Sequence, residues 1–469
     1  MAGSLVAGGV ALQPSAEQVA LSTNYITTFD FLNQYLPDTY EKEFERYGNR
    51  TISGFLRMVG AEMPSNSDLI KWAEQGRLHT KYTACTSGSY TGAETTQTIT
   101  VPLAQLIPGT GTIAIRVGQT VMMSDETAGS AFSNKAIVTT VGVGAANEFT
   151  IAYYEATQAA YAAASTLTVF AYGSEFAKGT NGMAGSLESD DLFLSNNPII
   201  LKDTYAVNGS DMAQIGWVEV TSENGANGYL WYLKSEHETR LRFDDTLETA
   251  MIEAIPAAVG SGATAAGFIG SEGIFSAVGT RGNVWNGGFP VALADFDAII
   301  SRLDKQGAIE ENALFVNRDF NFAIDDMLAA QNSYGAGGTS YGLFDNDEEM
   351  ALNLGFSGFR RGYDFYKTDW KYLNDPTMRG DLTGGKVSGL LVPAGSTSVY
   401  DQVLGKNAKR PFLHVRYRAS QTEDRRYKTW ITGSAGGART SSLDAMEVNF
   451  LSERAVCVMG ANNFVLFQG

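Results

Sequence analysis

The sequence predicts an α+β fold of about two or three domains, with a small all-β module inserted into the main chain. Three observations support it: dense strand patterning near the C-terminus, one long amphipathic helix, and a charge-poor stretch of short β-like runs. At 469 residues the chain exceeds one ordinary core. Its hydrophobic content of 44% is ample for folding.

The C-terminal residues 411–469 carry the clearest strand signals. Pro411–Ser420 and Arg425–Gly433 alternate apolar and polar residues, as half-buried strands do. Met446–Phe467 supplies two further strands around a turn at Gly460–Asn463. We therefore expect this end of the chain to lie within sheets.

A change in amino-acid composition marks the inserted module between Thr86 and Gly173. Thr, Ala, Val and Gly dominate there, and charged residues are few. Five β-like runs are separated by turns, namely TTQTITVPL, IAIRVGQTVMM, AIVTTVGV, EFTIAYY and STLTVFAYG. Regular short strands with Gly and Pro between them are typical of a small barrel or sandwich.

The best helix signal lies at Tyr229–Ile255. Apolar residues and one histidine recur there at helical spacing, and Pro256 ends the pattern. The stripe comprises Leu233, His237, Leu241, Leu247, Met251 and Ile255.

Other segments are assigned from local signals. We expect an N-terminal extended arm with short helical patches, a capped helix at Pro64–Gly76, a strand at Leu78–Cys85 and a large β-hairpin from Ser174 to Val220. We also expect a flexible glycine-rich loop at Ala257–Gly288, a helix at Asp295–Ala308, a strand in ENALFVNR, a helix at Asp319–Gln331 and a glycine loop at Tyr334–Gly342.

Charge and cysteine content narrow the function classes. The formal net charge of −17 argues against a protein that grips nucleic acid by neutralising its phosphates, but not against a wall that encloses it. Cys85 and Cys457 lie far apart and suggest buried free thiols. No apolar run is long enough for a membrane span, and no signal peptide is evident, so synthesis in the cytoplasm is expected.

Catalytic, cofactor and metal motifs are not found in the sequence. Gly380–Val387 nearly matches a phosphate-binding loop, but Val387 replaces the required hydroxyl and a strand is expected to follow, so a turn is the preferred interpretation. His79, His237 and His414 stand alone, without ligand spacing. We predict no catalytic residue, cofactor or metal site.

An arginine-rich set provides the candidate functional residues. Arginine forks suit paired contacts with carboxylates across protein interfaces. The candidates for inter-subunit contacts are Arg360, Arg361, Arg416, Arg418, Arg425, Arg426, Glu423, Asp424 and Glu453. The alternative is that they form surface pairs within one chain, worth about 0 to 1 kcal/mol each.

Taken in order, these segments resemble the major capsid protein of tailed double-stranded DNA bacteriophages, the Hong Kong 97 fold. The resemblance rests on the arm, on SEFAKGTNG…NNPIILKDTYAVNGSDMAQIGWVEV, on the long helix, on NALFVNRDFNFAIDDML, and on the closing strands through DAMEVNFLSERAVCVMGANNFVLF. It covers the chain outside the inserted module.

The resemblance implies the following division of the chain: arm 1–50, start of a peripheral domain 51–85, inserted module 86–173, extended hairpin loop 174–228, spine helix and glycine-rich connection 229–289, axial domain 290–403, and return strands of both domains 404–469. It also implies a structural subunit, not an enzyme, that self-assembles into hexamers and pentamers of an icosahedral shell around DNA. The implied partners are a scaffolding protein, a portal and a decoration protein. Assembly would take place in the host cytoplasm, and the product would be the virion capsid.

Two other functions stay open. One is an encapsulin-like bacterial nanocompartment shell, against which the inserted module and the length argue. The other is a secreted β-rich carbohydrate-binding or adhesive protein, against which the long helix and the absence of a recognisable signal peptide argue.

Overall fold

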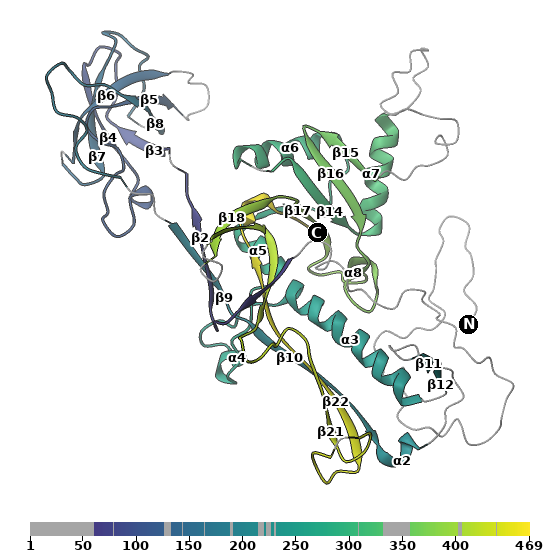
Figure 1. The fold of residues 1–469 in the computed structure, drawn as a ribbon. Coiled ribbons are helices and arrows are strands. Elements are labelled where there is room, and N and C mark those ends of the chain that lie inside the picture. Colours follow the sequence, from purple (N-terminus) through teal and green to yellow (C-terminus); the bar gives the residue numbers. More distant parts are fainter. Residues whose placement is uncertain are drawn as a thin grey trace, which may run out of the picture. The chain divides into compact units, whose positions relative to one another are not determined.

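The chain forms two compact units, Met1–Trp72 with Ser195–Gly469, and Ala73–Leu194 (Figure 1). The computed structural model describes residues 61–77, 79–125, 133–142, 144–163, 165–187, 191–213, 220–221, 227–228, 231–307, 309–331, 357–401, 406–437 and 439–469. The predicted N-terminal arm, its helical patches and the glycine loop at Tyr334–Gly342 lie outside these residues. We describe each unit by itself.

The unit Ala73–Leu194 is built on a closed barrel with strand order β3-β4-β7-β6-β5-β8. Its strands are β3 (Lys81–Ser87), β4 (Thr96–Thr100), β5 (Gln119–Asp125), β6 (Asn134–Val141), β7 (Glu148–Tyr153) and β8 (Leu167–Ser174), with a short 3-10 turn, η3 (Leu103–Gln105). Alternate side chains fill the interior, such as Val121 and Met123 of β5, which are fully buried. The five predicted β-like runs each contain a strand, and closure leaves the barrel without free edges.

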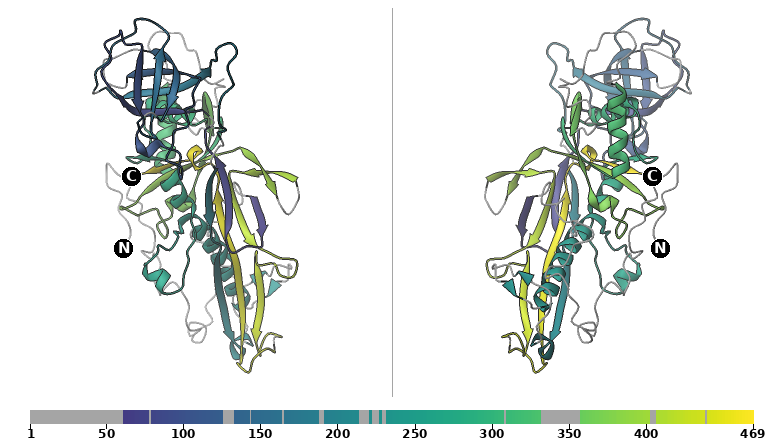
Figure 2. Two further views of the ribbon diagram at one scale, coloured as in Figure 1. Left: turned by 90° about the vertical axis from the view of Figure 1, so that its left-hand side faces the viewer. Right: turned by 90° about the vertical axis from the view of Figure 1, so that its right-hand side faces the viewer.

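In the larger unit, a five-stranded sheet has the order β1-β20-β22-β10, with β21 paired to β22. The strands are β1 (Ala61–Ser65), β10 (Ile199–Asn208), β20 (Leu413–Arg418), β21 (Lys428–Gly433) and β22 (Ala445–Val458). Helix α3 (Trp231–Glu253) lies along one face of the sheet, as the two views of Figure 2 show from opposite sides. Phe243 and Leu247 of the helix pack against a row of β22 residues, Met446, Val448 and Phe450.

The predicted long helix is confirmed, whereas its predicted stripe is confirmed only in part, at Leu247 and Met251. The buried apolar residues of α3 are Phe243, Leu247, Met251 and Ile252, whereas His237 and Ile255 are exposed. The row at residues 243, 247 and 251 advances four residues at a time, because this face meets β22. Leu233 lies in the helix, but its side chain is outside the described ones.

The expected hairpin of residues 174–220 takes a different form in its described part. β10 pairs along its whole length with β22, from Ile199 opposite Arg454 to Asn208 opposite Ala445. β9 (Asp191–Asn196) pairs instead with β2 (Ile70–Gln75). β9 and β10 therefore belong to different sheets and form no hairpin with each other. The second strand expected in the hairpin, QIGWVEV, spans residues 214–220, of which 214–219 lie outside the described ones.

A six-stranded sheet has the order β13-β23-β17-β14-β16-β15. Its strands are β13 (Asn283–Asn286), β14 (Glu311–Val316), β15 (Gly358–Arg361), β16 (Tyr363–Asp369), β17 (Val387–Pro393) and β23 (Val465–Gln468). Helices α6 (Leu293–Lys305) and α7 (Arg318–Gln331) share a core with one face, where Leu314 of β14 lies. Phe315 of β14 belongs to the core on the other face, with α5 (Ile274–Arg281). Both faces are buried, so β17 is buried throughout.

The remaining elements are short. They are α2 (Gly209–Met212), α4 (Gly262–Ala265), α8 (Lys371–Asn374), the turn η5 (Ala461–Asn463), the paired strands β11 (Val220–Thr221) and β12 (Asn227–Gly228), and the ribbon of β18 (Ser396–Asp401) with β19 (Lys406–Pro411).

The predicted capped helix at Pro64–Gly76 is wrong, because this segment contains the end of β1 and then β2. The SNSD sequence forms a turn in which Ser67 Oγ donates to the Leu69 carbonyl at 3.0 Å. Ile70 packs with Ala455 and Cys457 of β22, and Trp72 packs against the same cluster. This contact with a distant strand favours a two-residue period over the local helix-capping signal.

The predicted flexible loop at Ala257–Gly288 is also wrong, since it contains α4, α5 and β13. Ile274, Ala277 and Val278 of α5 are buried in the main core. A Cβ on Gly273 would lie 2.7 Å from the Ala254 nitrogen, so glycine here permits close packing against the end of α3. The glycines that suggested flexibility include one that the packing requires.

Candidate functional site

β20 and β21 lie one after the other along the same edge of β22. β20 pairs with Arg454–Val458, and β21 pairs with Met446–Leu451, while β10 occupies the opposite edge. Between them, residues 419–427 leave the sheet in a turn closed by a hydrogen bond from Ser420 N to the Glu423 carbonyl at 2.8 Å. The 419–427 turn carries charged side chains to the middle of the sheet.

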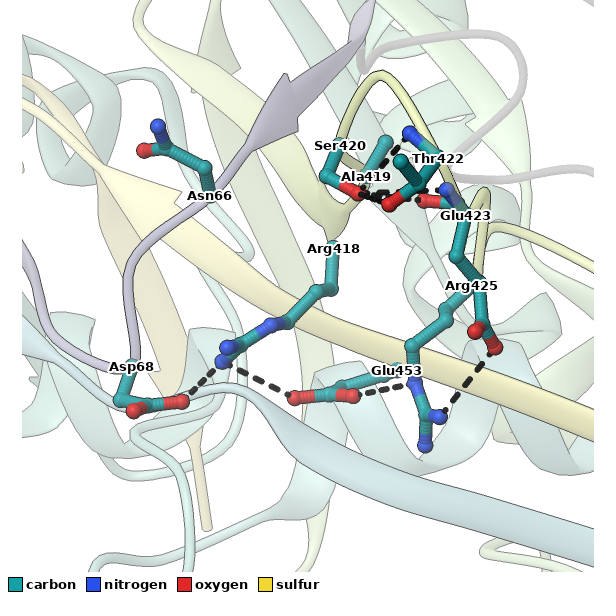
Figure 3. Close-up of a pocket in the computed structure, with 9 residues that line it drawn as sticks. All are labelled: Asn66, Asp68, Arg418, Ala419, Ser420, Thr422, Glu423, Arg425 and Glu453. Atoms are coloured by element: carbon teal, nitrogen blue, oxygen red, sulfur yellow. Dashed lines mark hydrogen bonds and ion pairs between the residues drawn. The ribbon is translucent and has the colours of Figure 1, made fainter.

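On one side, an ion-pair cluster forms around Glu453, which we call the Glu453 cluster (Figure 3). Arg425 Nε forms an ion pair with Glu453 Oε2 at 2.6 Å, and Arg418 Nη1 lies 3.6 Å from Glu453 Oε1. Arg418 also pairs with Asp68, which follows β1. Glu453 is only 9% exposed, so the two arginines supply the compensation that a buried carboxylate requires.

Glu423 extends the Glu453 cluster toward solvent. Lys428 Nζ donates to its Oε1 at 2.7 Å, and Arg425 lies 3.7 Å away. The hydrogen bond from Lys428 lowers the pKa of Glu423. The bond to Asp68 raises the pKa of Arg418. Both shifts favour the charged forms of these two side chains.

A second cluster lies on the opposite face of the same sheet, around Glu62 of β1. Glu62 pairs with Arg426 and, at 3.4 Å, with Arg454. Arg454 also donates to Ser452 Oγ at 2.9 Å and to the Arg426 carbonyl at 2.9 Å. Glu453 and Arg454, neighbours on β22, point to opposite faces as strand geometry dictates. Together the two clusters fix three strands and the 419–427 turn.

A hollow of about 500 Å³ opens beside the Glu453 cluster. Its lining residues are Asn66, Asp68, Arg418, Ala419, Ser420, Thr422, Glu423, Arg425 and Glu453. Figure 3 shows Arg418 between Asp68 and Glu453, and Arg425 between Glu453 and Glu423. With both signs of charge at its wall, the hollow can receive a polar or charged group from another protein surface.

The structure brings together most of the predicted arginine-rich set. Arg418, Arg425, Arg426, Glu423 and Glu453 belong to the two clusters. Asp424 accepts a hydrogen bond from the Arg426 backbone nitrogen at 2.8 Å, and Arg416 lies on β20 two residues before Arg418. All the ion pairs named above lie within one chain. A role for these residues between subunits stays a prediction.

Two predicted residues lie in the other sheet. Arg360 of β15 pairs with Asp364 of β16 at 3.2 Å. Arg361 pairs with Asp297 of α6, with one bond of 2.7 Å. That bidentate pair lowers the pKa of Asp297 and raises that of Arg361. Arg361 thus links the edge strand of the six-stranded sheet to helix α6, whereas Arg360 links it to the next strand.

The sequence did not point to four charged members of the clusters: Glu62, Asp68, Lys428 and Arg454. Asp68 was assigned to a helix cap, and Glu62 precedes it by a few residues. Arg454 directly follows Glu453 in the sequence, which was the available signal. Only the parallel pairing of β1 with β20 brings Glu62 and Asp68 to this site.

The other sites considered from the sequence show no catalytic arrangement. Gly380–Val387 precedes β17, a strand, so the segment lacks the helix N-terminus that binds phosphate. Within the described ranges, no three His, Cys, Asp or Glu side chains gather as metal ligands. Among those same residues, no helix combines the length and apolar character needed to cross a membrane.

Comparison with known proteins gives structural neighbours only. No family model and no curated protein matches the sequence. The capsid of a native GTA particle is 9% identical, with a TM-score of 0.40, over 92% of this chain and 95% of that one. A protein of Microbacterium phage Oxtober96 is 10% identical, with a TM-score of 0.35, over 93% and 96%. The SrpI encapsulin of Synechococcus elongatus is 10% identical, with a TM-score of 0.33, over 60% and 77%.

These TM-scores lie below 0.5, so the proposals that follow are argued from the chain's own architecture. Phage, GTA capsid and encapsulin proteins are among the structural neighbours of this chain.

Proposed function

We propose that this protein is a structural, non-enzymatic subunit that assembles with copies of itself into a closed icosahedral shell around double-stranded DNA. In this proposal the copies form pentamers and hexamers of a viral capsid. The family resemblance in the sequence suggests this class. The support within the molecule comes from surfaces that one copy leaves uncovered.

The observation that carries the proposal is the part of the second face of the five-stranded sheet that lies beyond the contact of β2 with Ala455 and Cys457. α3 covers one face of β10 and β22. Side chains alternate along a strand, so every second residue of β10 and β22 points to the opposite face. On that other face Ile200 of β10 is 53% exposed and Trp430 of β21 is 37% exposed. A sheet needs a second layer on each apolar face, and here a neighbouring copy would supply it.

One row of polar side chains on this face, Thr204, Asn449 and Thr432, is neutral and hydrogen-bonded within the sheet. Thr204 Oγ1 donates to Asn449 Oδ1 at 3.0 Å, and Asn449 Nδ2 donates to Thr432 Oγ1 at 3.0 Å. Covering them would leave no unpaired charge from this row, so the desolvation cost is small. The same face also carries Lys202, Lys428 and Glu447, so a covering copy would have to leave these charges paired or in water.

The parts of the fold take roles under this proposal. α3 would be the spine helix and the five-stranded sheet the peripheral domain, while the six-stranded sheet with α6 and α7 would form the axial domain. The Glu453 cluster, beside its hollow, would hold charged groups of an adjacent copy. The barrel unit would be an addition to the shell subunit.

The proposed partners follow from the same class. They are a scaffolding protein, a portal and a decoration protein, with assembly in the host cytoplasm and a final location in the virion. DNA would be enclosed without sequence recognition, in keeping with the net charge of −17.

Negative-stain electron microscopy of the purified full chain, with sedimentation velocity, tests the proposal. We expect closed shells or capsomer rings, and particles isolated from the natural source should protect DNA from nuclease. A variant Trp430→Glu, which places a charge on the uncovered face, should assemble at least 10-fold less well. Leu382→Glu, at a leucine outside that sheet that is 45% exposed, is the control.

Three results would contradict the proposal or redirect it. A stable monomer at high protein concentration would refute shell formation. Closed shells that contain protein cargo in place of DNA would indicate a nanocompartment. Glycan binding by a chain that does not self-associate would indicate an adhesive protein.

A further inference from the structure

The segment from Ile255 to Gly270, which we call the 255–270 loop, contains no charged residue. It follows α3 and contains the single turn α4. In a chain with 34 basic and 51 acidic residues, such a stretch would be expected in a buried segment. The structure shows the opposite.

Apolar side chains of the 255–270 loop face solvent. Val259 is 100% exposed, Ile255 70%, Phe268 69% and Ile269 56%. Single exposed apolar residues are common, but four in one short segment mark an interaction surface.

The loop nevertheless has a defined internal structure. A β-bridge joins Pro256 to Gly270 at its neck, and Ala257 N donates to the Ile269 carbonyl at 2.9 Å. Inside, Ser261 caps α4, and Thr264 Oγ1 donates to the Ala258 carbonyl at 2.7 Å. The apolar side chains are thus presented on a preformed support, which lowers the entropy cost of binding.

The same unit carries a small hollow of matching character between β13, β23 and α6. Its volume is about 170 Å³, and it is lined by Asn283, Val284, Trp285, Ala298, Ile299, Arg302, Leu303 and Val465. Leu303 and Val465 are buried at its base, whereas Ala298 is exposed at its rim. A cavity of about 150 Å³ with apolar walls accepts benzene, so this one has room for a phenyl ring.

We propose that Phe268 of one copy inserts into the hollow between β13 and α6 of a second copy. The inference rests on the proposed function and names one of its contacts. Phe268 is exposed in its own chain, so it does not fill that chain's own hollow. The polar rim, where Arg302 Nε donates to Asn283 Oδ1 at 3.0 Å, is already satisfied and needs no partner from the loop.

The contact joins two different surfaces, and so each copy can donate one loop and receive another. Such heterologous contacts produce rings when the rotation closes. Because the loop carries no charge, its approach adds no repulsion between two acidic copies. This is the geometry that pentamers and hexamers require.

Disulfide trapping tests the contact directly. A Phe268→Cys chain is mixed with an Ala298→Cys chain and oxidised; a cross-linked dimer is expected on a non-reducing gel. The double variant should give a ladder of higher multimers. Cys85 and Cys457 are buried, so neither competes. A mixture of Phe268→Cys with Phe322→Cys, on α7, is the control and should give no dimer above background.

Assembly of Phe268→Ser provides the second measurement. The loss of one buried phenyl ring should raise the protein concentration needed for assembly about 10- to 100-fold. Phe322→Ser removes a phenylalanine that is 56% exposed elsewhere, and it should assemble like the wild type.

The outcomes separate this contact from the wider proposal. Wild-type shells with normal assembly of Phe268→Ser and no trapped dimer would overturn the loop contact alone. A wild-type chain that never self-associates would overturn both. A dimer trapped in the Phe322 control as readily as in the test mixture would also count against the contact.

Discussion

Replacing Glu453 with glutamine removes the charge at the centre of the Glu453 cluster and keeps the shape of the side chain. Glu453 is 9% exposed and serves two arginines, with Arg425 at 2.6 Å and Arg418 at 3.6 Å. After the change, these arginines retain only their outer partners, Glu423 and Asp68.

The expected loss follows from the burial of the three groups. Removing one partner of a fully buried pair costs about 3–5 kcal/mol, whereas an exposed pair is worth about 0–1 kcal/mol. Arg425 is 26% exposed and Arg418 is 30% exposed, so water compensates part of the loss. We expect Glu453→Gln to lower the free energy of unfolding by about 1–2 kcal/mol.

Urea unfolding of the unassembled chain, followed by tryptophan fluorescence, measures this change, since Trp430 lies on the neighbouring β21. The matched control is Glu423→Gln, whose carboxylate is 46% exposed and belongs to the same cluster. It should cost less than about 0.5 kcal/mol. Equal effects of the two variants would refute the conclusion that burial of Glu453 makes this pair important.

Three further outcomes are expected. Leu390→Ala, at a fully buried position of β17, should cost about 2–5 kcal/mol in urea unfolding, and the exposed Leu382→Ala less than about 1 kcal/mol; similar values would contradict the assigned core. Gly433→Ala should lower the free energy of unfolding by about 3 kcal/mol, because φ is +122° and the new Cβ would lie 1.9 Å from the Ala445 carbonyl oxygen. Gly437→Ala, where the new Cβ meets open space, should cost about 1 kcal/mol. Soluble yield and urea midpoints measure both variants, and a larger loss in Gly437→Ala would contradict this reasoning. The pKa of Asp297 is lowered, so its ion pair stabilises the fold above the usual aspartate pKa of about 3.9, and this stabilisation is lost as the pH falls further. Asp297→Asn should therefore lower the free energy of unfolding at pH 7 and progressively less below about pH 4. A difference between the two proteins that does not change with pH would argue against the pair.

Local sequence patterns located many of the secondary-structure elements. The strands β20 to β23, the helix α3 and the strands of the barrel follow from two-residue or helical periodicity, which depends only on near neighbours in the chain. The helices at Asp295–Ala308 and Asp319–Gln331 were found in the same way, as α6 and α7.

Errors arose where a distant contact overrode a local signal. Ile70 and Trp72 form part of a strand because they pack against Ala455 and Cys457 of β22, although SNSD resembles a helix cap. Ala257–Gly288 was taken for a flexible loop on its glycine content, yet α5 fills the core and Gly273 allows its close approach to α3.

The candidate site likewise contains residues that the sequence indicated and residues that only a distant strand pairing brings there. The arginine-rich composition pointed to Arg418, Arg425 and Glu453, but not to Glu62 or Asp68. Those two reach the clusters only through the parallel pairing of β1 with β20.

The sequence by itself determined the mixed α and β character, the charge-poor β module and the group of arginines near the C-terminus. The tertiary structure alone decided that β22 pairs with β10 on one edge and with β20 and β21 on the other, and that Glu453 and Arg454 serve separate clusters on opposite faces. The reason is physical: periodicity is set by adjacent residues, whereas pairing, burial and ion-pair partners are set by segments that meet only after the chain has folded.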